Sequence, residues 1–453
     1  MNRSSFCCRF SFLFALVCAV ATAGSACESD SGDNGETNQN DAVGNGDSGA
    51  DGQGGNGSKP AGIFRVNQTT LGDQLRPRAV PLTAGALAGG VAVVWQDGAS
   101  SINSAVKIRL WDKNGVAATD ERQVATGQFP DIAISPDGQR LAVVFSTGEG
   151  NLSAIVVAQL FAATGEQDGD LVVFAKGKSA TRPRISTGSD GTTWVAYEIA
   201  DNPKGTTATG EPHVDVFAVM GPYPAALAAA TEIEVVKKGG RQSLEGLAAV
   251  SSGAVVSFWE PGLVGKPGPY VVHVGENGAK TPTLLSEVLG AADFAWPTVA
   301  PIPDGTGAVA LWYEWVGSGL SVQPALQVAR LDGLAKVLGT PGTVATFDPP
   351  APVEGTSAHV ALSADKSALV AWSTVVQLSG TLDIVVKPLS QTGEVVGSLE
   401  VLTKEAFASG KQLRPFVTAL HGGGYLVLWD SDSGADPEES PGTTGIYGRY
   451  MNY

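Results

Sequence analysis

Two sets of side chains that could do chemistry recur at matching places along this sequence. Acidic residues follow apolar segments that end in an aromatic residue: Asp97, Glu198, Glu260, Glu314 and Asp430. Arginines or aromatic residues stand directly before a proline in other short segments: Arg76, Phe129, Arg182, Trp296 and Arg414. Carboxylates act as acids, bases or cation ligands, arginines hold anionic groups, and aromatic rings stack on sugars or peptides.

The aromatic residues that end the apolar segments recur with the period of β-propeller blades. They are Trp95, Phe145, Tyr197, Trp259, Trp312, Trp372 and Trp429. The steps run from 50 residues (Trp95 to Phe145) to 62 residues (Tyr197 to Trp259), close to the longest propeller repeats of about 50 residues. Residues 130–133, 141–145, 154–161 and 171–174 show one unit of four short strands. The sequence predicts an all-β fold over residues 59–453, a seven-bladed β-propeller of four-stranded antiparallel blades.

The last unit of the repeat is one strand short. Its third strand lies at residues 446–450, close to the last residue, Tyr453. A spare apolar segment, residues 63–67, precedes the first inner strand. We expect this N-terminal strand to complete the last blade, because closing the ring removes the free sheet edges that an open array leaves.

In such a ring, the loops after each second strand and before each inner strand open on one face, where the two sets of side chains should meet. The candidate ligand-binding residues are Arg76, Arg182, Trp296, Arg414, Glu198, Glu260 and Glu314. The alternative explanation is structural, because ion pairs and packing between blades use the same residue types. The sequence leaves both explanations open.

A metal site is a further candidate. Asp430, Asp432 and Asp436 alternate with small residues and could present oxygens to Ca²⁺. Gly434 stands where calcium loops usually offer another side-chain oxygen, so an ordinary solvated acidic loop is the alternative. We expect no other cofactor. The four histidines fall in different units, and no Ser–His–Asp set or zinc spacing can be assembled from the sequence.

Two segments resemble known bacterial propeller repeats. Residues 135–142, Ser-Pro-Asp-Gly-Gln-Arg-Leu-Ala, are similar to a turn and strand of the propeller in the Tol–Pal translocation protein. The last unit, with residues 426–429 and 445–450, resembles repeats of large secreted bacterial surface proteins. These resemblances imply a lipid-anchored surface propeller of a Gram-negative bacterium. Residues 189–194, Ser-Asp-Gly-Thr-Thr-Trp, approach a sialidase box but lack one of its residues.

Residues 1–27 read as an export signal, with Arg3 and Arg9 before an apolar segment that is too short to span a membrane. Its end, Gly24-Ser25-Ala26-Cys27, resembles a lipobox, in which Cys27 is acylated; ordinary cleavage near Ala23 or Ala26 is the alternative. Residues 28–58 are rich in Gly, Asp, Asn and Ser and should form a disordered tether. We expect an outer-membrane or cell-surface location by lipid anchor, and otherwise a periplasmic or secreted protein.

Composition limits the partners. The net charge of −16 argues against nucleic acid, because phosphate binding needs a basic surface. No cysteine lies beyond Cys27, so the predicted propeller has no disulfide. We expect a monomer that touches the membrane through its lipid only, with a protein or polysaccharide of the cell envelope as partner.

Two functions are open. The leading hypothesis is a surface-anchored binding or scaffolding propeller without enzymatic activity. It rests on the export signal, the tether, the ring closure and the lack of a nucleophile or metal set. The alternative is a carbohydrate-active or other hydrolytic propeller enzyme. The carboxylates and Trp296 on one face of the ring motivate this alternative. Two carboxyl groups about 5–10 Å apart across a pocket would favour the enzyme.

The anchoring hypothesis predicts that Cys27→Ser moves the protein from the membrane to the soluble fraction, because the acylated side chain is lost. Fractionation of cells that produce each form, followed by immunoblotting, measures this. A wild-type protein that is already soluble after export would show that Cys27 carries no lipid.

Overall fold

The computed structural model describes residues 62–99, 103–148, 152–200, 213–222, 227, 229–237, 241–260, 266–286, 296–317, 323–347, 357–375, 382–403, 410–432 and 443–453. The chain separates into two units, residues 1–53 and 54–453, and all described residues belong to the second. The predicted export signal at 1–27, Cys27 and the tether at 28–58 lie outside the described residues. In the described part, no helix is long and apolar enough to cross a membrane.

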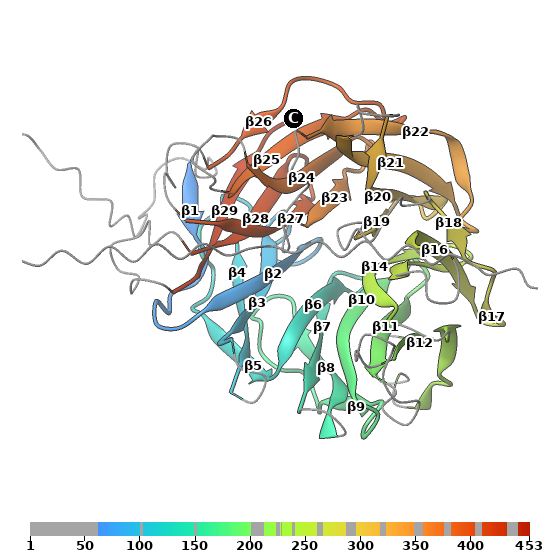
Figure 1. Cartoon of the computed structure of the whole chain (residues 1–453). Coiled ribbons are helices and arrows are strands. Elements are labelled where there is room, and N and C mark those ends of the chain that lie inside the picture. The colour runs from blue at the N-terminus through green and yellow to red at the C-terminus, as the bar shows by residue number, and fades with distance from the viewer. Residues whose placement is uncertain are drawn as a thin grey trace, which may run out of the picture. The chain divides into compact units, whose positions relative to one another are not determined.

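The described residues of the second unit form seven antiparallel blades (Figure 1). Blade 1 contains β2 (Gln74–Pro81), β3 (Val91–Asp97), β4 (Ala105–Trp111) and β5 (Arg122–Thr126). Blade 2 contains β6 (Gln128–Ile134), β7 (Arg140–Thr147), β8 (Ala154–Phe161) and β9 (Val172–Phe174). Blade 3 contains β10 (Ala180–Thr187), β11 (Thr192–Ala200), β12 (Val214–Pro222) and β13 (Ile233–Val236).

Blade 4 contains β14 (Ser243–Val250), β15 (Gly253–Glu260) and β16 (Gly268–Gly275); its fourth strand is split into β17 (Gly278–Ala279) and β18 (Thr283–Leu284), which both pair with β16. Blade 5 contains β19 (Thr298–Pro301), β20 (Gly307–Val316), β21 (Gln323–Asp332) and β22 (Val337–Thr346). Blade 6 contains β23 (Ala358–Leu362), β24 (Ala368–Val375), β25 (Leu382–Leu389) and β26 (Glu400–Val401). Blade 7 contains β27 (Gln412–Ala419), β28 (Tyr425–Ser431), β29 (Gly445–Met451) and β1 (Ile63–Arg65).

The blades form a closed ring. Each inner strand contacts the next, from β2 through β6, β10, β14, β19 and β23 to β27, and β27 contacts β2. The labels of these strands surround the middle of the ring in Figure 1, and β5, β9, β22 and β26 lie toward the rim. The predicted all-β fold, a seven-bladed propeller of four-stranded antiparallel blades, is confirmed.

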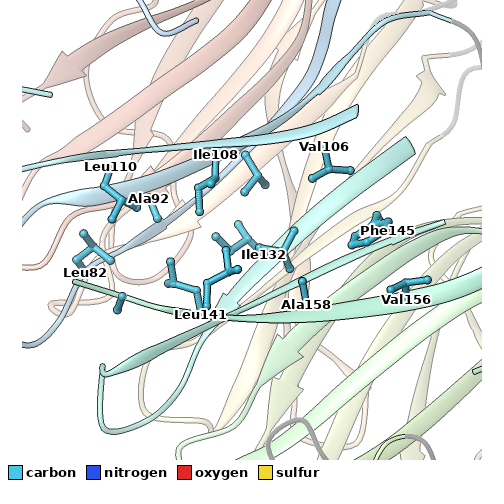
Figure 2. Packing of buried hydrophobic residues seen from close by; sticks show 14 residues of the cluster. Leu82, Ala92, Val106, Ile108, Leu110, Ile132, Leu141, Phe145, Val156 and Ala158 are labelled. Atoms are coloured by element: carbon cyan, nitrogen blue, oxygen red, sulfur yellow. The ribbon is translucent and has the colours of Figure 1, made fainter. Parts of the chain in front are cut away.

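Apolar packing between blades explains the aromatic period. In the described part there are seven buried apolar clusters, one at each interface between neighbouring blades. Figure 2 shows the interface of blades 1 and 2, where Ile108 and Leu110 of β4 face Ile132, Leu141 and Phe145 of blade 2. Phe145 ends an apolar segment and is 1% exposed. A sheet buried on both faces needs such continuous apolar strands.

The N-terminal strand closes the ring as the sequence predicts. Strand β1 pairs with β29 in an antiparallel register that places Phe64 opposite Gly448. The N–H of Val66 donates to the carbonyl of Ile446 at 2.8 Å, and the N–H of Ile446 donates to Oδ1 of Asn67 at 2.8 Å. The ring of Phe64 stacks on Tyr450, with 5.4 Å between the centroids. Backbone pairing and apolar contact therefore both hold β1 in blade 7.

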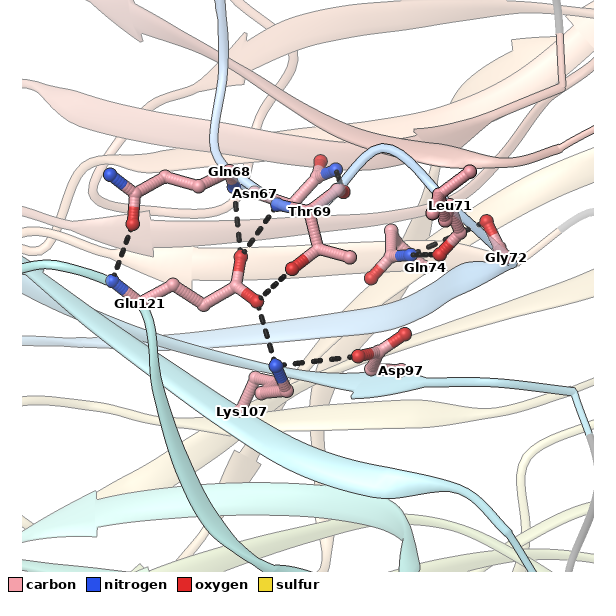
Figure 3. Close-up of polar contacts among 9 residues, drawn as sticks. All are labelled: Asn67, Gln68, Thr69, Leu71, Gly72, Gln74, Asp97, Lys107 and Glu121. Atoms are coloured by element: carbon pink, nitrogen blue, oxygen red, sulfur yellow. Dashed lines mark hydrogen bonds and ion pairs between the residues drawn. The ribbon is translucent and has the colours of Figure 1, made fainter. Parts of the chain in front are cut away.

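The segment that leaves β1 is tied to blade 1 (Figure 3). The carboxylate of Glu121 accepts hydrogen bonds from the N–H groups of Gln68 (2.8 Å) and Thr69 (3.1 Å) and from the Thr69 hydroxyl (2.6 Å). Lys107 lies 2.8 Å from the same carboxylate and 3.4 Å from Asp97. The first described residues thus bridge blade 7 and blade 1.

Removing the first strand should open the ring. A chain that begins at residue 71 loses β1 and the fully buried Val66, and burial of such a side chain contributes about 1.5–3 kcal/mol. We expect it to melt at a lower temperature and to aggregate through the exposed edge of β29. A chain that begins at residue 60 is the control, and calorimetry with light scattering compares the two. Equal melting temperatures and solubilities would contradict closure by β1.

Candidate functional site at the propeller axis

Four inner strands begin with the same strained turn. Arg76, Phe129, Arg182 and Arg414 each precede a proline and have positive φ angles between 50° and 58°. The pairing register of each inner strand shifts at this point. A left-handed conformation costs a non-glycine residue about 1–3 kcal/mol and persists only where its surroundings enforce it. Such bulges redirect side chains next to functional sites.

Side chains of the preceding blade hold several of these strand starts in place. The N–H of Arg76 donates to Asp430 Oδ2 (3.2 Å), and the N–H of Phe129 donates to Gln96 Oε1 (3.2 Å). In blade 4, the N–H of Leu244 donates to Glu198 Oε1 at 2.8 Å. The three acceptors follow the closing aromatic residues and are at most 3% exposed. Glu198 and Asp430 therefore have a structural role between blades.

The starts of the inner strands surround a cavity of about 310 Å³. Its charged and aromatic lining residues are Arg76, Arg78, Phe129, Arg182, Arg184, Glu245, Trp296, His359 and Arg414. They come from all seven blades, so this set exists only in the closed ring.

The lining is divided into a cationic side and a mixed side. Blades 7, 1, 2 and 3 supply the arginines and Phe129, whose ring centroid lies 4.3 Å from the guanidinium of Arg76 and 5.8 Å from that of Arg182. Blades 4, 5 and 6 supply Glu245, Trp296 and His359. The mixed side borders the arginines at both ends, because Arg184 donates to the backbone carbonyl of Glu245 and His359 accepts from the N–H of Val417 in blade 7.

Three arginines are paired with carboxylates. Arg182 lies 3.5 Å from Glu198, Arg414 contacts Asp430, and Arg78 lies 3.9 Å from Asp131, a further buried acid. These contacts compensate much of the charge on that side of the cavity.

Arg76 and Arg184 are bound by neutral groups. Arg76 donates to the Gln96 amide oxygen at 3.0 Å. Arg184 donates to the carbonyls of Glu245 (3.2 Å) and Pro183 (3.0 Å). Within the described part of the chain, neither guanidinium has an ion-pair partner. Burial, and then the charge of Arg414, lowers the pKa of Arg76 to about 10, so it stays protonated at neutral pH.

The surroundings shift the pKa values of two other titratable lining groups toward their neutral forms. Burial raises the pKa of Glu245, and this outweighs the opposite effects of Arg182 and Arg184. Burial, with the charges of Arg78 and Arg184, lowers the pKa of His359 to about 3. The Nδ1 atom of His359 accepts a hydrogen bond from the N–H of Val417 at 3.4 Å. The imidazole of His359 is therefore uncharged at neutral pH, and the pKa of Glu245 lies above its usual range.

The predicted ligand-binding residues fall into two groups. Arg76, Arg182, Arg414 and Trp296 line the cavity. The three glutamates are outside its lining: Glu198 anchors blade 4, Glu260 accepts from Gln242 Nε2 (2.8 Å), and Glu314 accepts from Trp312 Nε1 (3.2 Å). These three glutamates form hydrogen bonds inside the protein, as the structural explanation for the acidic residues expects.

Sequence reasoning missed Arg78, Arg184 and Glu245. The first two had a signal, because the triplet Arg-Pro-Arg occurs both at 76–78 and at 182–184. Glu245 had none, because its strand starts without the proline that marks five of the inner strands.

The calcium hypothesis remains a prediction. Asp430 is fully buried against Arg414, Asp432 accepts a hydrogen bond from the N–H of Lys411, and Asp436 lies outside the described residues. In the part of the chain that the structure describes, no group of three or more His, Cys, Asp or Glu residues could hold a metal ion.

Tyr197 and Glu232 form a hydrogen-bonded pair outside the lining of the cavity. Tyr197 donates to Glu232 at 2.5 Å, but Tyr197 is 1% exposed and packs in the cluster between blades 2 and 3. Burial, followed by the contact with Glu232, raises the pKa of Tyr197. This pair is a core contact.

No family model and no curated protein matches the chain. Among solved structures, it is similar to an ulvan lyase from a polysaccharide lyase family, with 9% identity over 86% of this chain and 96% of that chain and a TM-score of 0.47. It is also similar to the NanB sialidase of Streptococcus pneumoniae, with 10% identity, 88% and 71% covered, and a TM-score of 0.46. A Hadza microbial sialidase shows 11% identity, 80% and 76% covered, and a TM-score of 0.45. These likenesses concern the fold alone.

The leading hypothesis from the sequence, a binding or scaffolding propeller without enzymatic activity, is contradicted. Carbohydrate-active enzymes are frequent among the similar solved structures, which also include arabinofuranosidases and a family-43 glycoside hydrolase. The hypothesis rested in part on the lack of a visible catalytic set. In a propeller such a set is assembled across blades, so distant residues such as Arg76 and Glu245 meet only in the ring.

The anchoring role of Glu198 can be measured. Glu198→Ala leaves the buried N–H of Leu244 without its acceptor, which costs about 1–3 kcal/mol of unfolding free energy. Glu198→Gln keeps an amide oxygen as acceptor and should cost much less. Urea unfolding of both variants tests this, and equal losses would show that the hydrogen bond to Leu244 contributes nothing.

Proposed function

We propose that this propeller is a carbohydrate-active enzyme that binds an acidic saccharide in its axial cavity and cleaves it there. The observation that carries the proposal is the divided lining of the cavity. Arginines occupy one side, and Glu245, Trp296 and His359 occupy the other. A polar cavity with convergent charged groups and shifted pKa values is where a ligand site is expected.

The cationic side suits the acid group of the saccharide. Arginine binds planar carboxylates, and the related sulfate groups, through two parallel N–H donors. Arg76 donates to a neutral amide oxygen, so an anionic ligand would supply a counter-charge to its guanidinium. A neutral saccharide would leave that charge uncompensated in a half-buried site, which disfavours its binding.

The mixed side suits the sugar ring and the bond that is cleaved. The indole of Trp296 offers an apolar face for the C–H groups of a pyranose. Glu245, whose pKa is raised by burial, would donate its proton to the glycosidic oxygen as the bond from that oxygen to the anomeric carbon breaks, so the leaving sugar departs as an alcohol. A water molecule then bonds through its oxygen to the anomeric carbon, its proton is released to solvent, and Glu245 takes up a proton again. Among the described lining residues, Glu245 is the one acidic residue. The criterion of two carboxyl groups about 5–10 Å apart across a pocket is therefore not met there.

The location of the activity is also a proposal. The signal at residues 1–27 and the lipobox-like end at Cys27 support export and attachment to the outer membrane. A lipid-anchored propeller would then meet polysaccharides of the cell envelope or its surroundings.

The test is turnover of acidic polysaccharides by the purified protein, followed as release of reducing ends. The panel contains polyuronates, sialylated glycans and sulfated glycans, each with a neutral counterpart. We expect cleavage of at least one acidic member. Glu245→Gln, which keeps the shape but cannot donate the same proton, should lower kcat by about 10²- to 10⁴-fold with little change in KM.

Glu314→Gln is the matched control, because Glu314 lies outside the lining and contacts Trp312 of its own strand. It should leave kcat unchanged. An absence of cleavage across the panel, or an equal loss in both variants, would refute the proposal.

A further inference from the structure

The side chain behind each strained arginine occupies an equivalent position in three blades. The residue before Arg76 pairs with Gln96, the residue before Arg182 pairs with Glu198, and the residue before Arg414 pairs with Asp430. In blades 3 and 7 this position holds a carboxylate, which pairs with the arginine of its own blade. In blade 1 the same position holds an amide. The three sites differ in charge, whereas their backbone geometry is shared.

The surroundings of Gln96 select an amide. Its Oε1 accepts from Arg76 Nη1 (3.0 Å) and from the N–H of Phe129 (3.2 Å), and its Nε2 donates to the carbonyl of Gly98 (2.8 Å). The side chain is 1% exposed. A glutamate in this place would set an oxygen against the Gly98 carbonyl, where a donor is needed. The neutral charge at this position is therefore built into the local hydrogen bonding.

We infer that Gln96 is a specificity-determining positioning residue, which orients Arg76 without neutralising it and so makes Arg76 the principal holder of the ligand's anionic group. This inference rests on the proposed function and names its recognition step. Arg182 and Arg414 have the same turn but carry their own carboxylates. They shape the cavity and contribute less net charge to it. The ligand class is a carboxylate- or sulfate-bearing saccharide.

Exchange of the two side chains between blades tests the inference. Gln96→Glu gives Arg76 the carboxylate that blade 3 has, and Glu198→Gln gives Arg182 the amide that blade 1 has. We expect Gln96→Glu to weaken binding of an acidic ligand by about 10- to 100-fold, the range for a charge-assisted contact. Glu198→Gln should strengthen it. Binding of neutral sugars should change little in either variant, a pattern that a merely structural role would not produce.

Isothermal titration calorimetry at constant ionic strength measures binding of inorganic sulfate, sodium glucuronate and glucuronate methyl ester. Sulfate and glucuronate separate the two anionic groups, and the methyl ester is the neutral match of the same sugar. Arg76→Gln should abolish the preference for glucuronate over its ester. Gln96→Glu loses the hydrogen bond to the Gly98 carbonyl, so its melting temperature is recorded as a test of folding. If Gln96→Glu does not fold, Glu198→Gln still gives an independent result.

The outcomes separate this inference from the proposed function. An unchanged preference for glucuronate over its ester in Glu198→Gln, and in a folded Gln96→Glu, would overturn the role of Gln96 even if the enzyme cleaves acidic glycans. A wild-type protein that binds neither anion would overturn it as well. Shifts of opposite sign in the two variants, without any glycan cleavage, would support the anion site and count against the enzyme.

Discussion

A buried backbone N–H at the start of an inner strand needs an acceptor, and in this propeller the preceding blade supplies it. Asp430, Gln96 and Glu198 accept the N–H groups of Arg76, Phe129 and Leu244, respectively. Each bond fixes one blade against the next at the face where the cavity opens. The strained turns at Arg76 and Phe129 are held by two of these contacts and by the prolines that follow. The placement of Arg76 at the axis follows from this arrangement.

The same contacts decide the electrostatics of the cavity. An acceptor for a buried N–H can be a carboxylate or an amide, and both satisfy the hydrogen bond. They differ in charge, because a carboxylate neutralises the neighbouring arginine and an amide does not. Glu198 and Asp430 compensate Arg182 and Arg414, whereas Gln96 leaves the charge of Arg76 in place. Glu198 and Asp430 thus alter the net charge of the cavity, although neither is one of its lining residues.

Ring closure connects this site to the rest of the fold. The cavity draws on all seven blades, and the first and last described strands meet in blade 7. Val66 and Phe64 belong to the cluster that joins blade 7 to blade 1, and Arg76 and Arg414 belong to these same two blades. Loosening β1 would therefore act on the arginine side of the cavity as well as on stability.

The sequence by itself determined the architecture, because the aromatic period, the tight turns and the spare N-terminal strand are local signals that survive in the fold. It also identified Arg76, Arg182, Arg414 and Trp296, since each of them stands before a proline at the start of its strand. Only the tertiary structure decided which charges face the cavity. Glu198 and Glu260 look alike in the sequence as acids after aromatic residues, and both serve as buried acceptors. Glu245, which carries no such mark, reaches the axis because β14 lies beside β10 in the ring. A local pattern records strand positions, but the direction in which a side chain points, and the group that it meets, depend on bulges and on blades far apart in sequence.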